Sequence, residues 1–179
     1  MKNSTKTLSR KTRRTPKADA KMEMAFSIYR SQLPLYRKVE DKELFCKLNR
    51  NPLFDITTNL KKYKTRWVSA KAVGLESDEI VWDHFVQRSM VVRIIFDKMV
   101  QNPHMKLGGF QRLVKKYCQQ VCITKDEHQL INTETRGKED YNFTLYDKLG
   151  IKFVYNTSRG RKKNFHYEMY KNYGPLLAQ

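Results

Sequence analysis

The pattern of hydrophobic and polar residues is clearest between Ile80 and Val100, the most apolar stretch of comparable length in the chain. β-Branched and aromatic residues dominate its first part, from Ile80 to Val86, and predict a short strand. Ser89 is then expected to cap a helix. The inward positions of this helix recur every three or four residues: Val92, Ile95, Phe96 and Met99.

Two helices are predicted before this stretch. The first is expected to end at Pro34, because the residue before a proline disfavours helical backbone. Its inward face comprises Met22, Phe26, Tyr29 and Leu33. The second helix is predicted from Val39 to Leu48, closed by Asn51-Pro52. Its expected inward residues are Leu44, Phe45 and Leu48.

Shorter elements are predicted after Asn102-Pro103, which breaks the chain, and Gly108-Gly109, which indicates a flexible turn. They are a helix with inward residues Phe110, Leu113, Val114 and Tyr117, a strand at Val121–Ile123, and a helix that opens with the capping box Thr124-x-x-Glu127. A polar loop at Thr133–Asp140 is expected to precede a last helix, with Phe143, Tyr146 and Leu149 and a stop at Gly150, and a strand at Ile151–Tyr155. The fold class predicted is α+β: a mostly helical single domain over residues 22–179 with a few short strands.

Basic residues are concentrated in three segments. Residues 1–21 hold eight lysines and arginines against one acid, Asp19, and no aromatic residue, which predicts a disordered basic arm. The second segment lies near Trp67 and the third is a basic loop at 159–163, followed by an aromatic tail at 164–179. The predicted nucleic-acid contacts are Arg10, Lys11, Arg13, Arg14, Lys61, Lys62, Lys64, Arg66, Trp67, Arg159, Arg161, Lys162 and Lys163. For Tyr63 and Trp67 the alternative is a core position beside a solvated basic edge.

The charge balance indicates a polyanionic partner. The 179 residues include 36 lysines and arginines against 18 acidic residues, a formal net charge of +18. Nucleic acid is the expected partner, with DNA favoured over RNA, and an anionic membrane surface is a weaker alternative. No run of apolar residues is long enough for a membrane helix, so a membrane protein is not expected.

The three cysteines, Cys46, Cys118 and Cys122, are an odd number without an export signal, and we expect free thiols in a reducing, intracellular compartment. Buried thiols are the default interpretation, with zinc binding by Cys118, Cys122 and His128 as the alternative. Neither a phosphate-binding glycine loop nor a nucleophile motif is present in the sequence. No cofactor is therefore expected for a simple binding protein.

The candidate catalytic and metal-binding residues are Asp83, His84 and His128. The segment Asp-His-Phe-Val-Gln-Arg from Asp83 resembles the Asp-His-Ile-x-Pro core of the HNH nucleases, with Gln87 where that family has proline. The segment Ile-Thr-Lys-Asp-Glu-His-Gln-Leu, which contains His128, is similar to the helix on which many members end. The resemblance implies a Mg²⁺-dependent endonuclease in which His84 is the base and Asp83 and His128 are metal ligands. The other interpretation makes both imidazoles structural.

A second resemblance concerns small uncharacterised proteins of tailed phages. They share an Asp-His element, a Thr-Lys-x-Glu-His helix and a Tyr-x-x-x-Gly-Ile-x-x-Val ending, which here is Tyr146–Val154. Three functions follow from the sequence. A non-catalytic nucleic-acid-binding protein ranks first, followed by an HNH-like endonuclease that uses His84. A structural component of a ribonucleoprotein or virion is the third.

Overall fold

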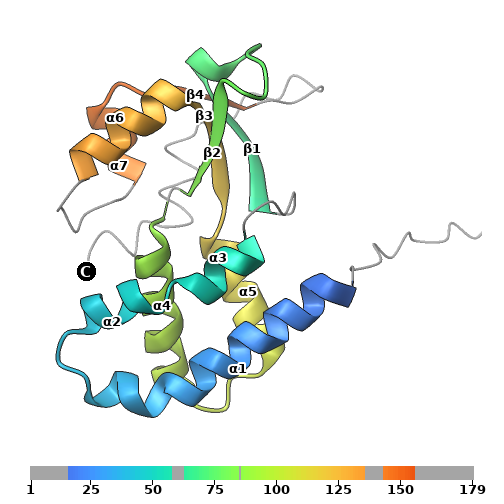
Figure 1. The fold of residues 1–179 in the computed structure, drawn as a ribbon, viewed down its shortest axis with the longest axis vertical. Coiled ribbons are helices and arrows are strands. Elements are labelled where there is room, and N and C mark those ends of the chain that lie inside the picture. Colours follow the sequence, from blue (N-terminus) through green and yellow to red (C-terminus); the bar gives the residue numbers. More distant parts are fainter. Residues whose placement is uncertain (1–15, 58–62, 85, 136–142, 156–179) are drawn as a thin grey trace, which may run out of the picture.

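A computed structural model describes residues 16–57, 63–84, 86–135 and 143–155 (Figure 1). Its helices are α1 Pro16–Lys38, α2 Lys42–Leu48, α3 Asn51–Thr57, α4 Arg88–Gln101, α5 Leu107–Tyr117, α6 Lys125–Thr135 and α7 Phe143–Lys148. The strands are β1 Lys64–Ser69, β2 Ile80–His84, β3 Gln120–Thr124 and β4 Phe153–Tyr155, with a 3-10 turn at Ala70–Ala72. Nearly all of the described hydrophobic residues that are buried belong to one cluster, and the predicted α+β, mostly helical single domain is confirmed.

The four strands form one sheet in the order β2-β3-β1-β4. Strand β3 runs parallel to β1 and antiparallel to β2, while β4 is antiparallel to β1. All five residues of β3 are buried, as expected for a central strand covered on both faces. Gln120 at its start pairs with His84 on one side and Lys64 on the other. The register therefore places these three residues in one row across the sheet.

Helices α1 to α5 form a layer at one end of the molecule, whereas α6 and α7 lie beside the sheet at the other end (Figure 1). An aromatic group holds the helical layer together, centred on Phe96 of α4, which is fully buried. Its ring stacks on Tyr36 at 4.6 Å between centroids and meets Tyr29 and Phe45 edge-on at 5.3 and 5.4 Å. The predicted inward face of α4 is confirmed, since Val92, Ile95, Phe96 and Met99 are all buried.

The prediction that Pro34 ends the first helix is wrong, because α1 continues through Pro34 to Lys38. A proline inside a helix removes one backbone hydrogen bond. Packing beyond the proline offsets this loss: Tyr36 is fully buried, stacks on Phe96 and donates a 2.6 Å hydrogen bond to Asp97. The same helix begins at Pro16, so residues 16–21 are helical and not part of a disordered arm. The remainder of the predicted arm, residues 1–15, lies outside the described residues.

The second predicted helix is shorter than expected and its phase is different. Helix α2 begins at Lys42, after the N-cap Asp41, whose side chain accepts a hydrogen bond from the Leu44 backbone amide. Leu44 and Leu48 were predicted to face inward, but they are exposed, and Cys46 is buried beside Phe45. Asn51-Pro52 was predicted to close this helix, but α2 already ends at Leu48. Asn51-Pro52 opens α3, where a proline in the first turn loses no helical hydrogen bond.

Two further local predictions are corrected by the structure. Helix α4 begins at Arg88 with Gln87 at the N-cap, and the Ser89 hydroxyl donates to the Gln87 side chain instead of capping the helix. Gly108 and Gly109 are not a flexible turn, because both lie in α5. A Cβ atom at Gly109 would lie 3.0 Å from Cγ of Met105, so glycine allows this close approach.

The elements around α6 and α7 follow the sequence pattern. The capping box is present: the Glu127 backbone amide donates to Thr124 Oγ1 at 3.1 Å, and the Thr124 amide donates to Glu127 Oε2 at 3.0 Å. Helix α6 runs to Thr135, so the loop predicted over Thr133–Asp140 does not begin at Thr133, and its residues from 136 on lie outside the described residues. Gly150 has a φ of 68° and ends α7 in the left-handed conformation that glycine adopts readily.

Candidate functional site

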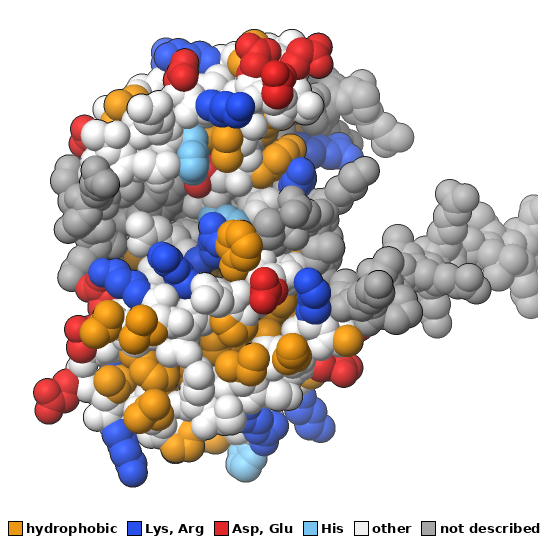
Figure 2. Space-filling view, viewed as in Figure 1, with side chains coloured by type: hydrophobic (Ala, Val, Ile, Leu, Met, Phe, Trp, Pro, Cys, Tyr) orange, Lys and Arg blue, Asp and Glu red, His pale blue; other side chains and the backbone are white. Residues whose placement is uncertain are grey.

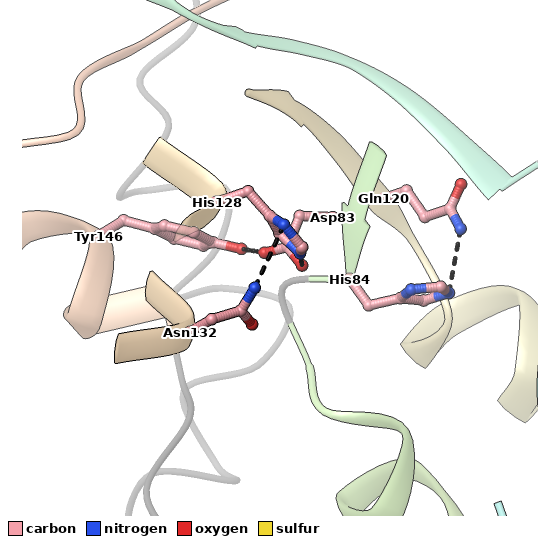
Figure 3. A network of polar contacts seen from close by, with 6 residues as sticks. All are labelled: Asp83, His84, Gln120, His128, Asn132 and Tyr146. Carbon is pink, nitrogen blue, oxygen red and sulfur yellow. Dashed lines mark hydrogen bonds and ion pairs between the residues drawn. The ribbon is translucent and has the colours of Figure 1, made fainter. Parts of the chain in front are cut away.

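Strand β2 ends in Asp83 and His84, whose side chains reach opposite faces of the sheet (Figure 3). Adjacent residues of a strand necessarily alternate in this way. Asp83 points toward α6 and α7, where His128, Asn132 and Tyr146 are located. His84 points toward Gln120 of β3. The structure therefore brings together two of the three residues in the predicted nuclease site, Asp83 and His128, and leaves His84 apart from them.

The Asp83 group joins three elements that are far apart in the sequence. The hydroxyl of Tyr146, on α7, donates a 2.7 Å hydrogen bond to Asp83 Oδ2. Nε2 of His128, on α6, lies 3.8 Å from Asp83 Oδ1. The His128 side chain is 35% exposed and that of Asp83 is 12% exposed, so a solute can reach the imidazole more readily than the carboxylate. Tyr146 was predicted as a helix position and as the start of the Tyr146–Val154 ending, and neither pattern indicates that its hydroxyl contacts Asp83.

Asn132 lies one helical turn after His128, and its Nδ2 is 3.3 Å from Nδ1 of the imidazole. With the amide nitrogen as donor, Nδ1 is the acceptor and the ring proton is on Nε2, facing Asp83. The arrangement resembles the carboxylate–imidazole pairs that transfer protons or hold a divalent cation. With the other tautomer, in which the ring proton is on Nδ1, the pair could supply two ligands to a metal ion, one carboxylate oxygen and Nε2 of the imidazole.

His84 is buried, with an exposed fraction of 9%, and its Nε2 lies 3.1 Å from Nε2 of Gln120. Burial lowers the pKa of His84 to about 4, and the positive charge of Arg88 contributes to the decrease. The imidazole is therefore neutral at pH 7. A neutral ring can accept the hydrogen bond from the Gln120 amide, whereas an imidazolium ion could not.

The residues that the structure describes contain no group of three or more histidines, cysteines or acidic residues suited to holding a metal ion. Cys118 and Cys122 therefore do not join His128 in a zinc site within this part of the chain. All three cysteines are free and buried, in agreement with the expected thiols. Burial raises the pKa of Cys46 and of Cys118 to about 12, so both remain protonated and unreactive near neutral pH.

A second group of side chains lies where β2 leads into α4. The guanidinium of Arg88, the first residue of α4, stacks on the ring of Phe54 with its Cζ 4.4 Å from the ring centroid. Phe54 belongs to α3 and is 43% exposed. Arg50, just before α3, lies close enough that its positive charge contributes to lowering the pKa of Arg88, after the larger effect of burial. The sequence predictions did not include Arg50 or Phe54, because only the tertiary fold places them beside Arg88.

The predicted nucleic-acid segment around β1 is partly corrected. Trp67 is 4% exposed and packs edge-on against Tyr155 at 4.8 Å, so a nucleotide base cannot stack on it. The core alternative therefore holds for Trp67, and Tyr63 is buried as well. Arg66 is exposed. Nζ of Lys64 lies 4.6 Å from the ring centroid of Trp82, which is partly exposed.

The other predicted nucleic-acid contacts lie outside the described residues. They are Arg10, Lys11, Arg13 and Arg14 in the arm, Lys61 and Lys62 before β1, and Arg159, Arg161, Lys162 and Lys163 in the basic loop. The aromatic tail at 164–179 also lies outside them.

Comparison of the chain with protein-family models, with curated proteins and with solved structures finds no match. Among the helices described here, none is long and apolar enough to cross a membrane.

Proposed function

We propose that the protein binds nucleic acid, with DNA favoured over RNA. The net charge of +18 carries this proposal. Even if each of the 18 acidic residues neutralised one cation, 18 lysines and arginines would have no counter-charge within the chain. A phosphate backbone supplies regularly spaced negative charges and releases its counterions when such cations bind, which makes the association favourable at low salt.

The described surface supports the proposal in the band between the sheet and the helical layer. Figure 2 shows lysine and arginine side chains gathered in this band, next to hydrophobic side chains. Two contacts in which a cation lies over an aromatic ring, Arg88 over Phe54 and Lys64 over Trp82, belong to elements that meet there. Cations combined with partly exposed rings are typical of surfaces that contact both phosphates and bases.

A salt-dependent titration of the whole protein tests the proposal. The fluorescence anisotropy of labelled 20-nucleotide oligothymidylate, duplex DNA and duplex RNA is measured from 50 to 200 mM KCl. If about six phosphates are contacted on duplex DNA, affinity should fall about 10³-fold over this range. DNA is expected to bind more tightly than RNA of the same length. Absence of binding to all three ligands at 50 mM KCl and micromolar protein would contradict the proposed function.

A second candidate function is metal-dependent cleavage of the bound nucleic acid, favoured by the 3.8 Å separation of Asp83 Oδ1 and His128 Nε2. A divalent cation held there would stabilise the charge that develops on a phosphate during hydrolysis. A site built on this pair excludes His84, which faces Gln120. The base that the HNH resemblance assigns to His84 would then have to come from elsewhere.

A cleavage assay on plasmid DNA and RNA with Mg²⁺, Mn²⁺, Ni²⁺ or EDTA tests this candidate. Asp83→Asn and His128→Ala should each reduce cleavage by about 10²-fold or more, since each removes a group that acts on the reacting phosphate. His84→Gln and His104→Ala should leave it nearly unchanged, because His84 faces the other side of the sheet and His104 is exposed on the loop before α5. Absence of cleavage by the wild-type protein with every metal would rule out the candidate.

A further inference from the structure

Arg88 is a partly buried cation without an ion-pair partner among the residues that the structure describes. Two charged groups act on Arg88 with opposite effects: Arg50 lowers the pKa of Arg88, and Asp83 raises it by a smaller amount. Asp83 already accepts a hydrogen bond from Tyr146 and lies beside His128. A guanidinium withdrawn from water in this way costs free energy unless an anion approaches it.

Arg50 precedes α3, and a backbone hydrogen bond joins it to the turn of the helix that carries Phe54. The Phe54 amide donates a 3.2 Å hydrogen bond to the Arg50 carbonyl, so the two residues are one helical turn apart. Arg88 stacks on the exposed Phe54 ring, and the charge of Arg50 acts on Arg88, so the two cations lie near each other at this end of α3.

Two neighbouring arginines repel each other, and this repulsion destabilises the protein on its own. The arrangement becomes favourable when an anion with several oxygen atoms lies between the guanidinium groups. A guanidinium donates two parallel hydrogen bonds to a phosphate, and stacking on a ring fixes the plane in which these donors lie. Phe54 thus orients the Arg88 donors before any ligand binds, which reduces the entropy lost on binding.

We infer that Arg50 and Arg88 together bind one phosphate group of the nucleic-acid backbone, with Phe54 holding the Arg88 guanidinium in place. The inference rests on the proposed function, and it deepens that function by assigning a phosphate site to residues that the sequence pattern did not indicate. The site lies at the junction of β2 and α4, close to the end of β2 that carries Asp83. The bound backbone would therefore pass near the Asp83–His128 pair.

Binding of labelled oligothymidylate to the full-length chain tests the inference. Arg50→Gln and Arg88→Gln are each expected to weaken binding about tenfold, the effect of losing a charged hydrogen bond. Each should also reduce the salt slope by about 0.7, the value for one phosphate contact on a single strand. The double variant should lose little beyond either single variant, because both arginines hold the same phosphate. Arg88→Lys keeps the charge but loses the paired donors, and it should bind less tightly than wild type.

Arg30→Gln is the matched control, since Arg30 also lies over a phenylalanine ring, that of Phe26, but is exposed on α1. The inference is overturned if Arg88→Gln and Arg30→Gln give the same affinity and salt slope while wild type binds. Thermal unfolding shows whether each variant is folded, and Arg88→Lys provides a second test if Arg88→Gln is not. A wild-type protein that binds no oligonucleotide refutes the proposed function itself, which is a distinguishable outcome.

The two arginines could also bind the phosphate group of a small molecule in place of the nucleic-acid backbone. Inorganic phosphate is titrated into the wild-type protein and Arg88→Gln while the melting temperature is recorded. On our inference, phosphate competes with oligothymidylate for the wild-type protein, and Arg88→Gln weakens both ligands. If phosphate stabilises only the wild-type protein while oligothymidylate binds both proteins equally, the assignment to the nucleic-acid backbone is wrong.

Discussion

Asp83 and His84 are neighbours in β2, yet Asp83 contacts Tyr146 of α7 on one face of the sheet and His84 contacts Gln120 of β3 on the other. The two side chains consequently lie in different environments. One is a carboxylate with hydrogen-bonding partners near the surface, and the other is a buried imidazole that stays neutral. A substitution at either residue is expected to affect different properties of the protein.

The buried His84 should make stability depend on pH. Its pKa falls from the usual 6.5 to about 4 in the folded protein, so below pH 6.5 the unfolded chain binds a proton that the folded chain does not. The free energy of unfolding should therefore decrease as the pH falls from about 6.5 to 4, by roughly 3 kcal/mol at most, and this contribution should be constant above about pH 7.5. Urea unfolding at a series of pH values measures the effect. His84→Gln should remove this pH dependence, whereas an unchanged profile would contradict the assignment.

The hydrogen bond between Tyr146 and Asp83 should contribute to the stability of the packing of α7 on the sheet. Tyr146→Phe removes the 2.7 Å contact without removing the buried ring, so the expected loss is about 1–2 kcal/mol. Combining it with Asp83→Asn in a double-mutant cycle isolates the interaction from the other contacts of each residue. Strict additivity of the two substitutions would show that the hydroxyl and the carboxylate are not coupled.

Phe96 should be among the most sensitive positions of the helical layer. Its fully buried ring contacts the rings of Tyr29, Tyr36 and Phe45, and Phe96→Ala should cost about 3–5 kcal/mol through lost burial and a residual cavity. Lys98→Ala on the exposed side of α4 should change stability by less than about 0.5 kcal/mol. Chemical denaturation of both variants tests the phase of α4. Similar losses at the two positions would contradict the structure.

The capping box of α6 allows a comparison of the threonine that precedes this helix with one inside it. Thr124→Ala removes the oxygen that accepts the Glu127 amide and should cost about 1 kcal/mol. Thr133→Ala is the control, because its exposed hydroxyl donates only to the Gln129 carbonyl one turn earlier and the change should be within about 0.5 kcal/mol. Equal losses would mean that Thr124 does not act as a cap.

Residues 1–15 contain six lysines and arginines and no acidic residue. Deleting them should weaken binding to duplex DNA and reduce the salt slope by about 0.9 for each phosphate contact removed. The melting temperature should stay nearly constant, because the deletion stops short of α1 and its first residue, Pro16. An unchanged salt slope would exclude these residues from phosphate binding.

The sequence predicted the elements whose signals are local. The inward face of α4 follows from side-chain spacing, and the capping box at Thr124 follows from hydrogen bonds within one turn. The strand predicted over Ile80–Val86 follows from β-branched and aromatic residues, and the structure ends it at His84. The prediction that Pro34 ends the first helix is wrong because the backbone penalty of proline is local, whereas the packing of Tyr36 on Phe96 that offsets it is tertiary.

The candidate site was predictable only in part for the same reason. Asp83 and His128 were predicted as members of one site, and in the structure Asp83 Oδ1 lies 3.8 Å from His128 Nε2. Adjacent side chains of a strand point to opposite faces of the sheet, so His84 and Asp83 cannot belong to one site on the same face. The contacts of Tyr146 with Asp83 and of Arg88 with Phe54 join residues from separate elements. No spacing rule along the chain could reveal them.

The parallel pairing of β1 and β3 has a consequence for the order of folding. Strand β2 and helices α4 and α5 separate β1 from β3 in the sequence. Strand β3 can therefore pair with β1 only after this long segment has folded back and brought the two strands together. Closing so large a loop costs entropy before any strand contact is gained, and such pairings form slowly. In the helical layer α1 packs on α3, and both α1 and α2 pack on α4. All of these helices precede β3 in the chain, so the layer is expected to form before β3 joins the sheet. The Tyr146–Asp83 hydrogen bond requires both the completed sheet and α7, and it should be among the last contacts to appear during refolding.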